Sequence, residues 1–205
     1  KPWLSRFAYT LVALFVVRQK YYFAWKSAEG ATNVWYAGFD GFDENGNPKG
    51  WEQSSNSNIL GFESAPSLQV LSKEWNKKTS LWLTRYVYIR TNGSLLATYG
   101  MSAFWHGFYP GYYLFFLSVP LVTLCERVGR KKISPYFSSS QFTLYGLLCT
   151  VVTSIFAAYM VSSFVLLSFD WSWENWKNNY FFGHVLCIVF YAVMSLVPAP
   201  KKKTS

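Results

Sequence analysis

Long apolar runs constrain this chain more than any other feature, because about 20 consecutive apolar residues are enough to cross a bilayer as a helix. Four segments approach or exceed that length, at residues 3–25, 95–126, 141–169 and 180–197. The sequence therefore predicts an all-α fold: a polytopic bundle of transmembrane helices that forms one membrane domain over residues 1–205.

The run at residues 95–126 is too long for one upright span and too short for two full spans. Gly107, Pro110 and Gly111 lie near its middle, and a proline inside a helix removes a backbone hydrogen bond. We expect either one strongly tilted helix or two segments broken near residues 107–111.

Composition indicates what the protein contacts. Aromatic residues make up 21% of the chain, and Trp and Tyr favour bilayer interfaces. The formal charge of +9 comes from basic residues that flank the apolar spans, which favours lipid headgroups as partners. No zinc-finger spacing or RNA-binding signature accompanies this charge, so no nucleic-acid partner is expected. The three cysteines lie in apolar spans without paired spacing and are interpreted as buried small hydrophobic residues.

Two segments between the first two spans are not purely apolar. Residues 30–66 are rich in Gly, Asn and Ser, which predicts a long polar loop. Asp43, Asn45 and Asn47 resemble the start of a calcium loop, but the glycine and glutamate that such a loop needs later are missing. Residues 66–90 place apolar side chains at spacings of three, four and seven, which predicts one amphipathic helix in the membrane interface.

Charges flanking the spans predict the topology. Basic residues between 127 and 132 and at 201–203 are expected on the cytosolic side, and the net acidic loop at 170–179 in the lumen. Lys202 and Lys203 resemble the dilysine signal of endoplasmic reticulum membrane proteins. The chain opens without Met beside an apolar run, so we expect it to be the C-terminal part of a longer membrane protein.

Asn92 begins an Asn-Gly-Ser glycosylation sequon. Because this topology places it in the cytosol, we expect it to stay unmodified.

Only one histidine lies in the long run between residues 95 and 125, which carries no formal charge: His106. An imidazole with a pKa of about 6.5 can accept and return a proton near neutral pH. Burial keeps it uncharged and available as a base. The alternative is a kinked membrane helix whose histidine is bonded to a neighbour, although ionisable residues inside membranes are functional candidates by default.

His184 lies in an otherwise apolar span without an acidic neighbour in sequence. We interpret it as a structural, hydrogen-bonded interior histidine. His106 has no Cys, His or carboxylate three or four residues away, and His184 has only Cys187 at that spacing, which is too few ligands, so no metal site is expected.

Two segments resemble a known family. Residues 105–112, Trp-His-Gly-Phe-Tyr-Pro-Gly-Tyr, resemble the WHGxxPGY signature of the membrane-bound O-acyltransferases, in their lysophospholipid acyltransferase branch. Residues 75–83 resemble the W-N-x-x-T-x-x-W-L context in which that family carries an asparagine. Weaker resemblances occur at residues 18–29 and 59–63. The likeness runs from about residue 18 to about residue 137 and implies a fragment of that family's fold.

The resemblance also implies site residues, with His106 and Asn76 as the catalytic pair. They are 30 residues apart, several fewer than we expect for this branch, which leaves the helix register between them open. Residues of the two motifs implied to bind substrate are Trp75, Thr79, Trp82, Trp105, Gly107, Tyr109, Pro110, Gly111 and Tyr112.

The implied reaction is transfer of an acyl group from acyl-CoA, as co-substrate and without a bound cofactor, to a lysophospholipid hydroxyl. His106 would remove the hydroxyl proton as general base. Asn76 would orient the hydroxyl or stabilise the oxyanion that develops on the thioester. Two alternatives remain: acylation of another acceptor (a sterol, a diacylglycerol or a protein), and a non-enzymatic membrane scaffold.

Overall fold

The computed structural model describes residues 2–137 and 143–198. The all-α prediction is confirmed: within these ranges the only β-type pairing is an isolated bridge between Phe42 and Pro48. The elements are α1 Trp3–Val34, α2 Ile59–Glu63, α3 Leu68–Glu74, α4 Lys77–Leu83, the π-helical turn η1 Thr84–Tyr88, α5 Leu95–His106, α6 Pro110–Lys132, the 3-10 turn η2 Ser134–Tyr136, α7 Leu144–Leu166, α8 Phe169–Asn178 and α9 Phe182–Leu196.

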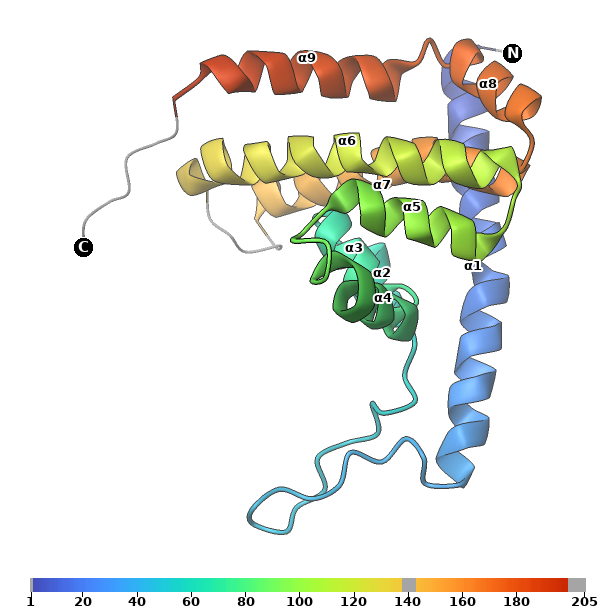
Figure 1. The fold of residues 1–205 in the computed structure, drawn as a ribbon, viewed down its shortest axis with the longest axis vertical. Coiled ribbons are helices and arrows are strands. Elements are labelled where there is room, and N and C mark those ends of the chain that lie inside the picture. Colours follow the sequence, from blue (N-terminus) through green and yellow to red (C-terminus); the bar gives the residue numbers. More distant parts are fainter. Residues whose placement is uncertain (1, 138–142, 199–205) are drawn as a thin grey trace.

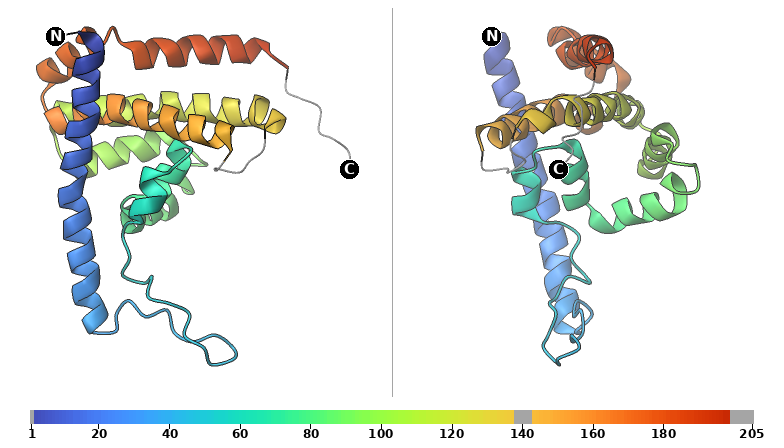
Figure 2. Two further views of the ribbon diagram at one scale, coloured as in Figure 1. Left: turned by 180° about the vertical axis from the view of Figure 1, so that it is seen from behind. Right: turned by 90° about the vertical axis from the view of Figure 1, so that its left-hand side faces the viewer.

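Four helices form the body of the fold. α6 lies between α5 and α9 and packs against α7, while α1 runs crosswise to them along one end (Figure 1). Figure 2 shows the short helices α2, α3 and α4 on one side of α6, with the loop after α1 extending away from the body.

Within the described ranges, two helices are long and apolar enough to cross a membrane by themselves: residues 110–136, which include α6, and α7. α8 and α9 pass the same test only together, and they are bent by 66° at the break between them. The segment predicted as the first span is helical, but α1 continues to Val34 and carries Arg18, Lys20 and Lys26 along its length. It is not among the candidate spans.

The core lies where α1 meets α6, α7, α8 and α9. Its buried residues are Phe7, Val122, Cys125, Tyr159, Met160, Trp176 and Cys187. All three cysteines are unpaired; Cys125 and Cys187 are buried, whereas Cys149 is only partly buried. Apolar side chains such as Leu147 and Val151 on α7 stay more than half exposed, as expected of a lipid-facing surface.

The single amphipathic helix predicted at residues 66–90 is wrong. The structure divides this segment into α3, α4 and η1, because Asn76 adopts the left-handed conformation, with φ 47° and ψ 51°. Asparagine enters this region more readily than most residues, but one such residue ends a helix. Ser67, whose hydroxyl accepts the N–H of Val70, begins α3.

The polar loop predicted at residues 30–66 is shorter than expected, because α1 occupies its start and α2 its end. The loop predicted at residues 170–179 is also wrong, since it is helix α8. The Ser168 hydroxyl caps α8 by accepting the N–H of Trp171, and Asp170 and Lys177 lie in its first and last turns, where each charge complements the helix dipole.

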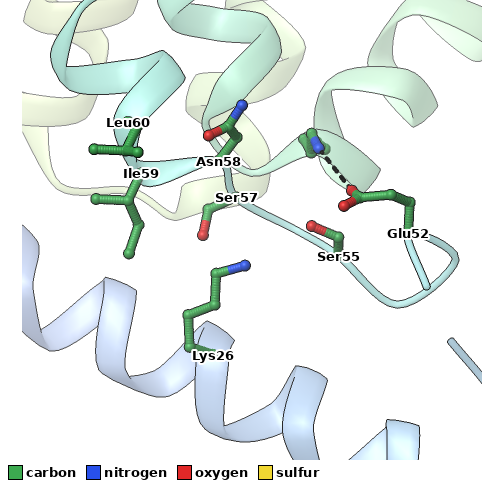
Figure 3. Close-up of a pocket in the computed structure, with 8 residues that line it drawn as sticks. Lys26, Glu52, Ser55, Ser57, Asn58, Ile59 and Leu60 are labelled. Atoms are coloured by element: carbon green, nitrogen blue, oxygen red, sulfur yellow. Dashed lines mark hydrogen bonds and ion pairs between the residues drawn. The ribbon is translucent and has the colours of Figure 1, made fainter. Parts of the chain in front are cut away.

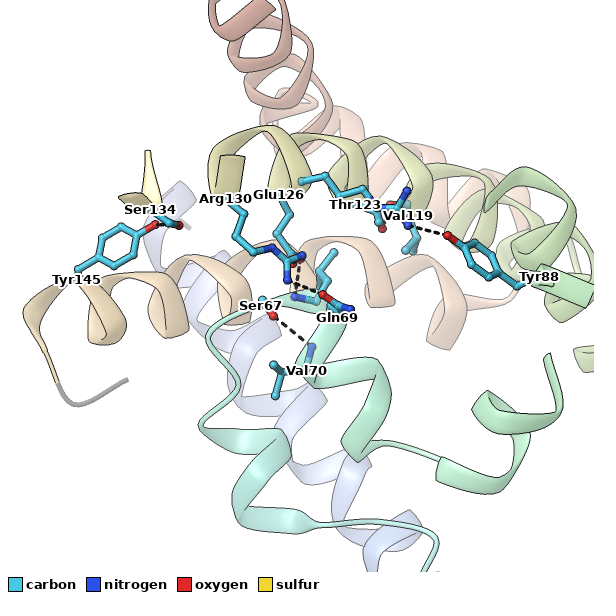
Figure 4. Close-up of polar contacts among 12 residues, drawn as sticks. Ser67, Gln69, Val70, Tyr88, Val119, Thr123, Glu126, Arg130, Ser134 and Tyr145 are labelled. Carbon is cyan, nitrogen blue, oxygen red and sulfur yellow. Dashed lines mark hydrogen bonds and ion pairs between the residues drawn. The ribbon is translucent and has the colours of Figure 1, made fainter. Parts of the chain in front are cut away.

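The start of α3 is anchored to the basic end of α6 (Figure 4). The Glu126 carboxylate accepts the Leu68 N–H at 2.8 Å and pairs with Arg130 at 2.5 Å. Arg130 also donates to the Gln69 side chain. Arg130, one of the basic residues expected on the cytosolic side, therefore also holds α3 in place. Lys202 and Lys203, the dilysine-like pair, lie outside the described residues.

Candidate functional site

The α5–α6 connection is a tight helical hairpin with His106 at its turn. α5 ends at His106, and Gly107 follows with φ 120°, a value that strongly favours glycine. Tyr109 is extended, and Pro110 begins α6, where its missing N–H costs no hydrogen bond. The predicted break near residues 107–111 is thus confirmed in its two-segment form, and the single tilted helix is wrong.

Gly111 fastens this hairpin to the end of α7. Its backbone N–H donates to the carbonyl oxygen of Leu167 at 2.7 Å, and Gly111 is buried. Tyr112, the next residue, packs its ring on Phe164 of α7 with centroids 4.5 Å apart. The turn that carries His106 is therefore fixed to α7 on one side.

Aromatic rings surround the His106 imidazole. Phe116 stacks on it with centroids 5.1 Å apart, Phe164 meets it edge-on at 5.0 Å, and Tyr112 lies at 5.5 Å. The side chain is partly buried, and none of the hydrogen bonds among the described residues involves either ring nitrogen. Among the residues that the structure describes, the imidazole is therefore positioned by packing, and its nitrogens are uncommitted there.

Asn76 lies on a separate turn, between α3 and α4. The ring of Trp75 packs against four aromatic side chains of α1 and α2, which fixes this turn: Tyr21, Tyr22, Trp25 and Phe62. The Asn76 Oδ1 atom accepts a hydrogen bond from Asn56 Nδ2 at 3.1 Å. The packing of Trp75 on α1 and α2 therefore fixes the position of the Asn76 turn.

A second set of contacts holds α1 to α2 close to that turn. Arg18 donates two hydrogen bonds to the Glu63 carboxylate, at 3.0 and 2.9 Å, and the Tyr22 hydroxyl donates to the same carboxylate at 2.8 Å. The weaker resemblances at residues 18–29 and 59–63 thus fall on segments that contact each other and the Trp75 ring.

An open cavity of about 350 Å³ separates α4 from α5. It is lined by Lys78, Thr79, Trp82 and Trp105. The structure thus brings together three of the residues that the resemblance implies for substrate binding, one of them adjacent in sequence to His106.

Asn76 and His106 line neither this cavity nor the larger one described next. Nor does any ring contact or hydrogen bond among the described residues join their side chains. Each is close in sequence to a residue that lines the cavity between α4 and α5: Asn76 is three residues before Thr79, and His106 directly follows Trp105. Their pairing in one reaction stays a prediction.

The larger cavity, about 390 Å³, lies between α1 and the segment that leads into α2, and the sequence does not predict it (Figure 3). It is lined by Lys26, Glu52, Ser55, Ser57, Asn58, Ile59, Leu60 and Lys77. Lys77 pairs with Glu52 at 3.4 Å, and the buried Ser57 hydroxyl has no hydrogen-bond partner among the described residues. This mostly polar lining is unsuited to an acyl chain.

His184 is hydrogen bonded at both ring nitrogens, as predicted. Nδ1 lies 2.8 Å from the Tyr159 hydroxyl, and Nε2 lies 3.1 Å from the Ser118 hydroxyl. It thereby links α6, α7 and α9. Within residues 2–137 and 143–198, no three His, Cys, Asp or Glu side chains are grouped so that they could hold a metal ion.

Known sequences resemble this chain over the segments that form these two turns. Residues 1–169 match the sequence model described as the MBOAT, membrane-bound O-acyltransferase, family. The chain is 39% identical to membrane-bound glycerophospholipid O-acyltransferase 2 of Homo sapiens over 97% of its own length and 38% of that protein. It is 31% identical to a lysophospholipid acyltransferase of Schizosaccharomyces pombe, over 95% of the chain and 41% of that protein.

A third relative is lysophospholipid acyltransferase 6 of Drosophila melanogaster, 37% identical over 90% of the chain and 26% of that protein. The chain thus spans about two fifths or less of the length of these relatives.

Proposed function

The chain belongs to the membrane-bound O-acyltransferase family, and from that premise we propose that it transfers a fatty acyl group from acyl-CoA to the free hydroxyl of a lysophospholipid. The relatives named above carry glycerophospholipid or lysophospholipid acyltransferase in their names, which supports a lysophospholipid acceptor. The apolar surfaces of α6 and α7 suit a substrate that arrives through the bilayer.

The observation that carries this proposal is the state of the His106 imidazole. It is held in place by four aromatic rings, those of Tyr112, Phe116, Phe164 and its neighbour Trp105, while both nitrogens lack partners among the described residues. A general base must be fixed in position and free to take a proton, and this packing meets both needs. By contrast, both nitrogens of His184 are bonded, so that side chain has no free nitrogen for the role.

In the proposed reaction, His106 accepts the proton of the lysophospholipid hydroxyl while the hydroxyl oxygen attacks the thioester carbonyl. The new ester bond forms, the carbon–sulfur bond breaks, and the electron pair leaves with the sulfur of coenzyme A. The histidine then returns the proton to that thiolate. No covalent acyl-enzyme is needed, because the thiolate is a good leaving group. Asn76 contributes hydrogen bonding, since its carboxamide does not titrate in this range.

The cavity between α4 and α5 is the proposed approach to this chemistry. Trp82 and Trp105 offer flat apolar walls, and Thr79 supplies a hydroxyl. Aromatic side chains with a polar edge suit a substrate whose acyl chain is apolar and whose headgroup is wet. A neighbouring water-poor site would also limit hydrolysis of the thioester.

We further propose that the protein resides in the endoplasmic reticulum membrane with its C-terminus in the cytosol, because Lys202 and Lys203 resemble a dilysine signal. The basic residues at the end of α6 agree with a cytosolic position for that end.

The function is tested by acyl transfer in membranes that contain the full-length protein, using a panel of lysophospholipids alongside a sterol and a diacylglycerol. Labelled acyl-CoA is the donor, and the labelled product is identified by mass. Transfer confined to lysophospholipids supports the proposal. Transfer only to a sterol or diacylglycerol would replace the proposed acceptor, and no transfer to any lipid would contradict a lipid acyltransferase.

A further inference from the structure

The helix α4 is capped by a residue from a different segment. The backbone N–H of Lys77 donates to the Asn56 carbonyl oxygen at 2.8 Å, and the N–H of Lys78 donates to Asn56 Oδ1 at 3.0 Å. Asn76 occupies the N-cap position itself but makes no capping bond with its side chain. The first two free amides of α4 are therefore satisfied by Asn56, and the Asn76 carboxamide is released from this task.

This arrangement fixes which way both carboxamides face. A backbone N–H can only donate, so the Asn56 atom that meets Lys78 must be oxygen. The remaining Asn56 atom is then its NH₂ group, which donates to Asn76 at 3.1 Å. The Asn76 atom that receives this bond must be its own oxygen. It follows that the Asn76 NH₂ group is the one left without a partner among the described residues.

We infer that Asn56 is a positioning residue, which holds the Asn76 carboxamide so that it presents its NH₂ group, and never its oxygen, to a ligand. This inference rests on the proposed function, in which Asn76 takes part in acyl transfer. It selects between the two roles open to Asn76: a group that presents only N–H bonds can stabilise the thioester oxyanion but cannot accept a bond from the attacking hydroxyl.

The backbone of Asn76 allows a test that keeps the turn intact. Aspartate also tolerates the left-handed conformation and would still accept the bond from Asn56. Asn76→Asp therefore keeps the turn and the Asn56 contact while removing the N–H donors. We expect its turnover to fall by about 10²-fold or more. A variant with turnover near that of the wild type would overturn the donor role.

The positioning role is tested by Asn56→Asp. A carboxylate at position 56 can still accept the Lys78 N–H but cannot donate to Asn76, so the Asn76 carboxamide should rotate and present its oxygen to the ligand. We expect kcat to fall by about 10²-fold with little change in KM for either substrate. The matched control is Asn58→Asp in the same loop, whose side-chain oxygen caps Gly61 and does not contact Asn76.

Asn76→Gly separates this inference from the proposed function. Glycine suits the left-handed backbone at position 76 and removes the carboxamide. If Asn76→Gly keeps normal turnover, Asn76 has no role in acyl transfer and both proposals fail at that residue.

If Asn76→Gly is inactive but Asn56→Asp matches its control, only the positioning role is overturned. We expect Asn56→Asp to cause no further loss in the Asn76→Gly background, because both changes remove the same donor. Thermal melting in detergent identifies a variant that fails to fold, and the Asn76→Asp result then still decides the donor role.

Discussion

Gly111 donates its backbone N–H to the carbonyl oxygen of Leu167 at 2.7 Å, and this contact joins the α5–α6 hairpin to the end of α7. The approach is close enough to exclude any side chain. A Cβ atom built on Gly111 would lie 2.3 Å from the Ser163 carbonyl oxygen and 2.8 Å from backbone atoms of Leu167. The glycine of the hairpin motif is thus required by packing against α7, in addition to any role near substrate.

We therefore expect Gly111→Ala to destabilise the protein by about 1–3 kcal/mol, because backbone atoms cannot move aside as a flexible side chain can. Turnover should also fall, since the hairpin carries His106. Apparent melting temperature in detergent and acyl transfer measure the two effects. Gly100→Ala in α5 is the control: its Cβ would meet nothing within 4 Å, and alanine favours a helix, so stability should hold or rise. Equal losses in the two variants would contradict the packing argument.

The Arg18–Glu63 pair should stabilise the fold more than an exposed ion pair does. Arg18 makes two hydrogen bonds with the carboxylate, which also accepts the Tyr22 hydroxyl. Arg18→Lys loses the paired geometry, and we expect a cost of about 1 kcal/mol.

Lys26→Ala is the comparison, because it breaks the exposed Lys26–Glu29 pair and should change stability by no more than about 0.5 kcal/mol. Thermal melting of Arg18→Lys and Lys26→Ala under the same conditions shows which ion pair stabilises the fold more. A larger shift in melting temperature for Lys26→Ala than for Arg18→Lys would show that the Arg18–Glu63 pair is not the more stabilising contact.

His184 should matter for stability and not for chemistry. His184→Phe leaves the Tyr159 hydroxyl, on a side chain only 1% exposed, without its partner, at an expected cost of about 1–3 kcal/mol. Acyl transfer per folded molecule should stay close to that of the wild type. If the variant melts normally but loses turnover, the structural interpretation of His184 is wrong.

The sequon at Asn92 tests the topology. Asn92 lies in the exposed turn before α5, so an enzyme in the same compartment would reach it. Because we place this turn in the cytosol, treatment with an N-glycosidase should not change the mobility of the protein made in eukaryotic cells. A shift to lower mass would reverse the proposed orientation.

The sequence predicted those features whose causes are local. Gly107 and Pro110 follow His106 within four residues, and the helix break that they indicate is the observed hairpin. Helix α8 also has local signals, in the Ser168 cap and the Asp170 and Lys177 charges, although the polar composition of that segment was interpreted as a loop.

The helix break at Asn76 could not be predicted from local sequence signals. Its causes lie far away in the sequence: Asn56 caps α4, and aromatic rings of α1 and α2 hold Trp75. The periodic apolar pattern over residues 66–90 continues across the break, so pattern alone predicted one helix. For the same reason no pattern in the sequence indicates that Asn56 is a neighbour of Asn76, since 20 residues separate them.

The central claim is that the uncommitted imidazole of His106 is the base that activates the acceptor hydroxyl. His106→Gln is the most direct test, because glutamine has similar size and can form hydrogen bonds but cannot take up the proton. We expect acyl transfer to fall by about 10²–10⁴-fold while expression and melting temperature stay unchanged. Turnover equal to the wild type in a normally folded His106→Gln protein would contradict the claim.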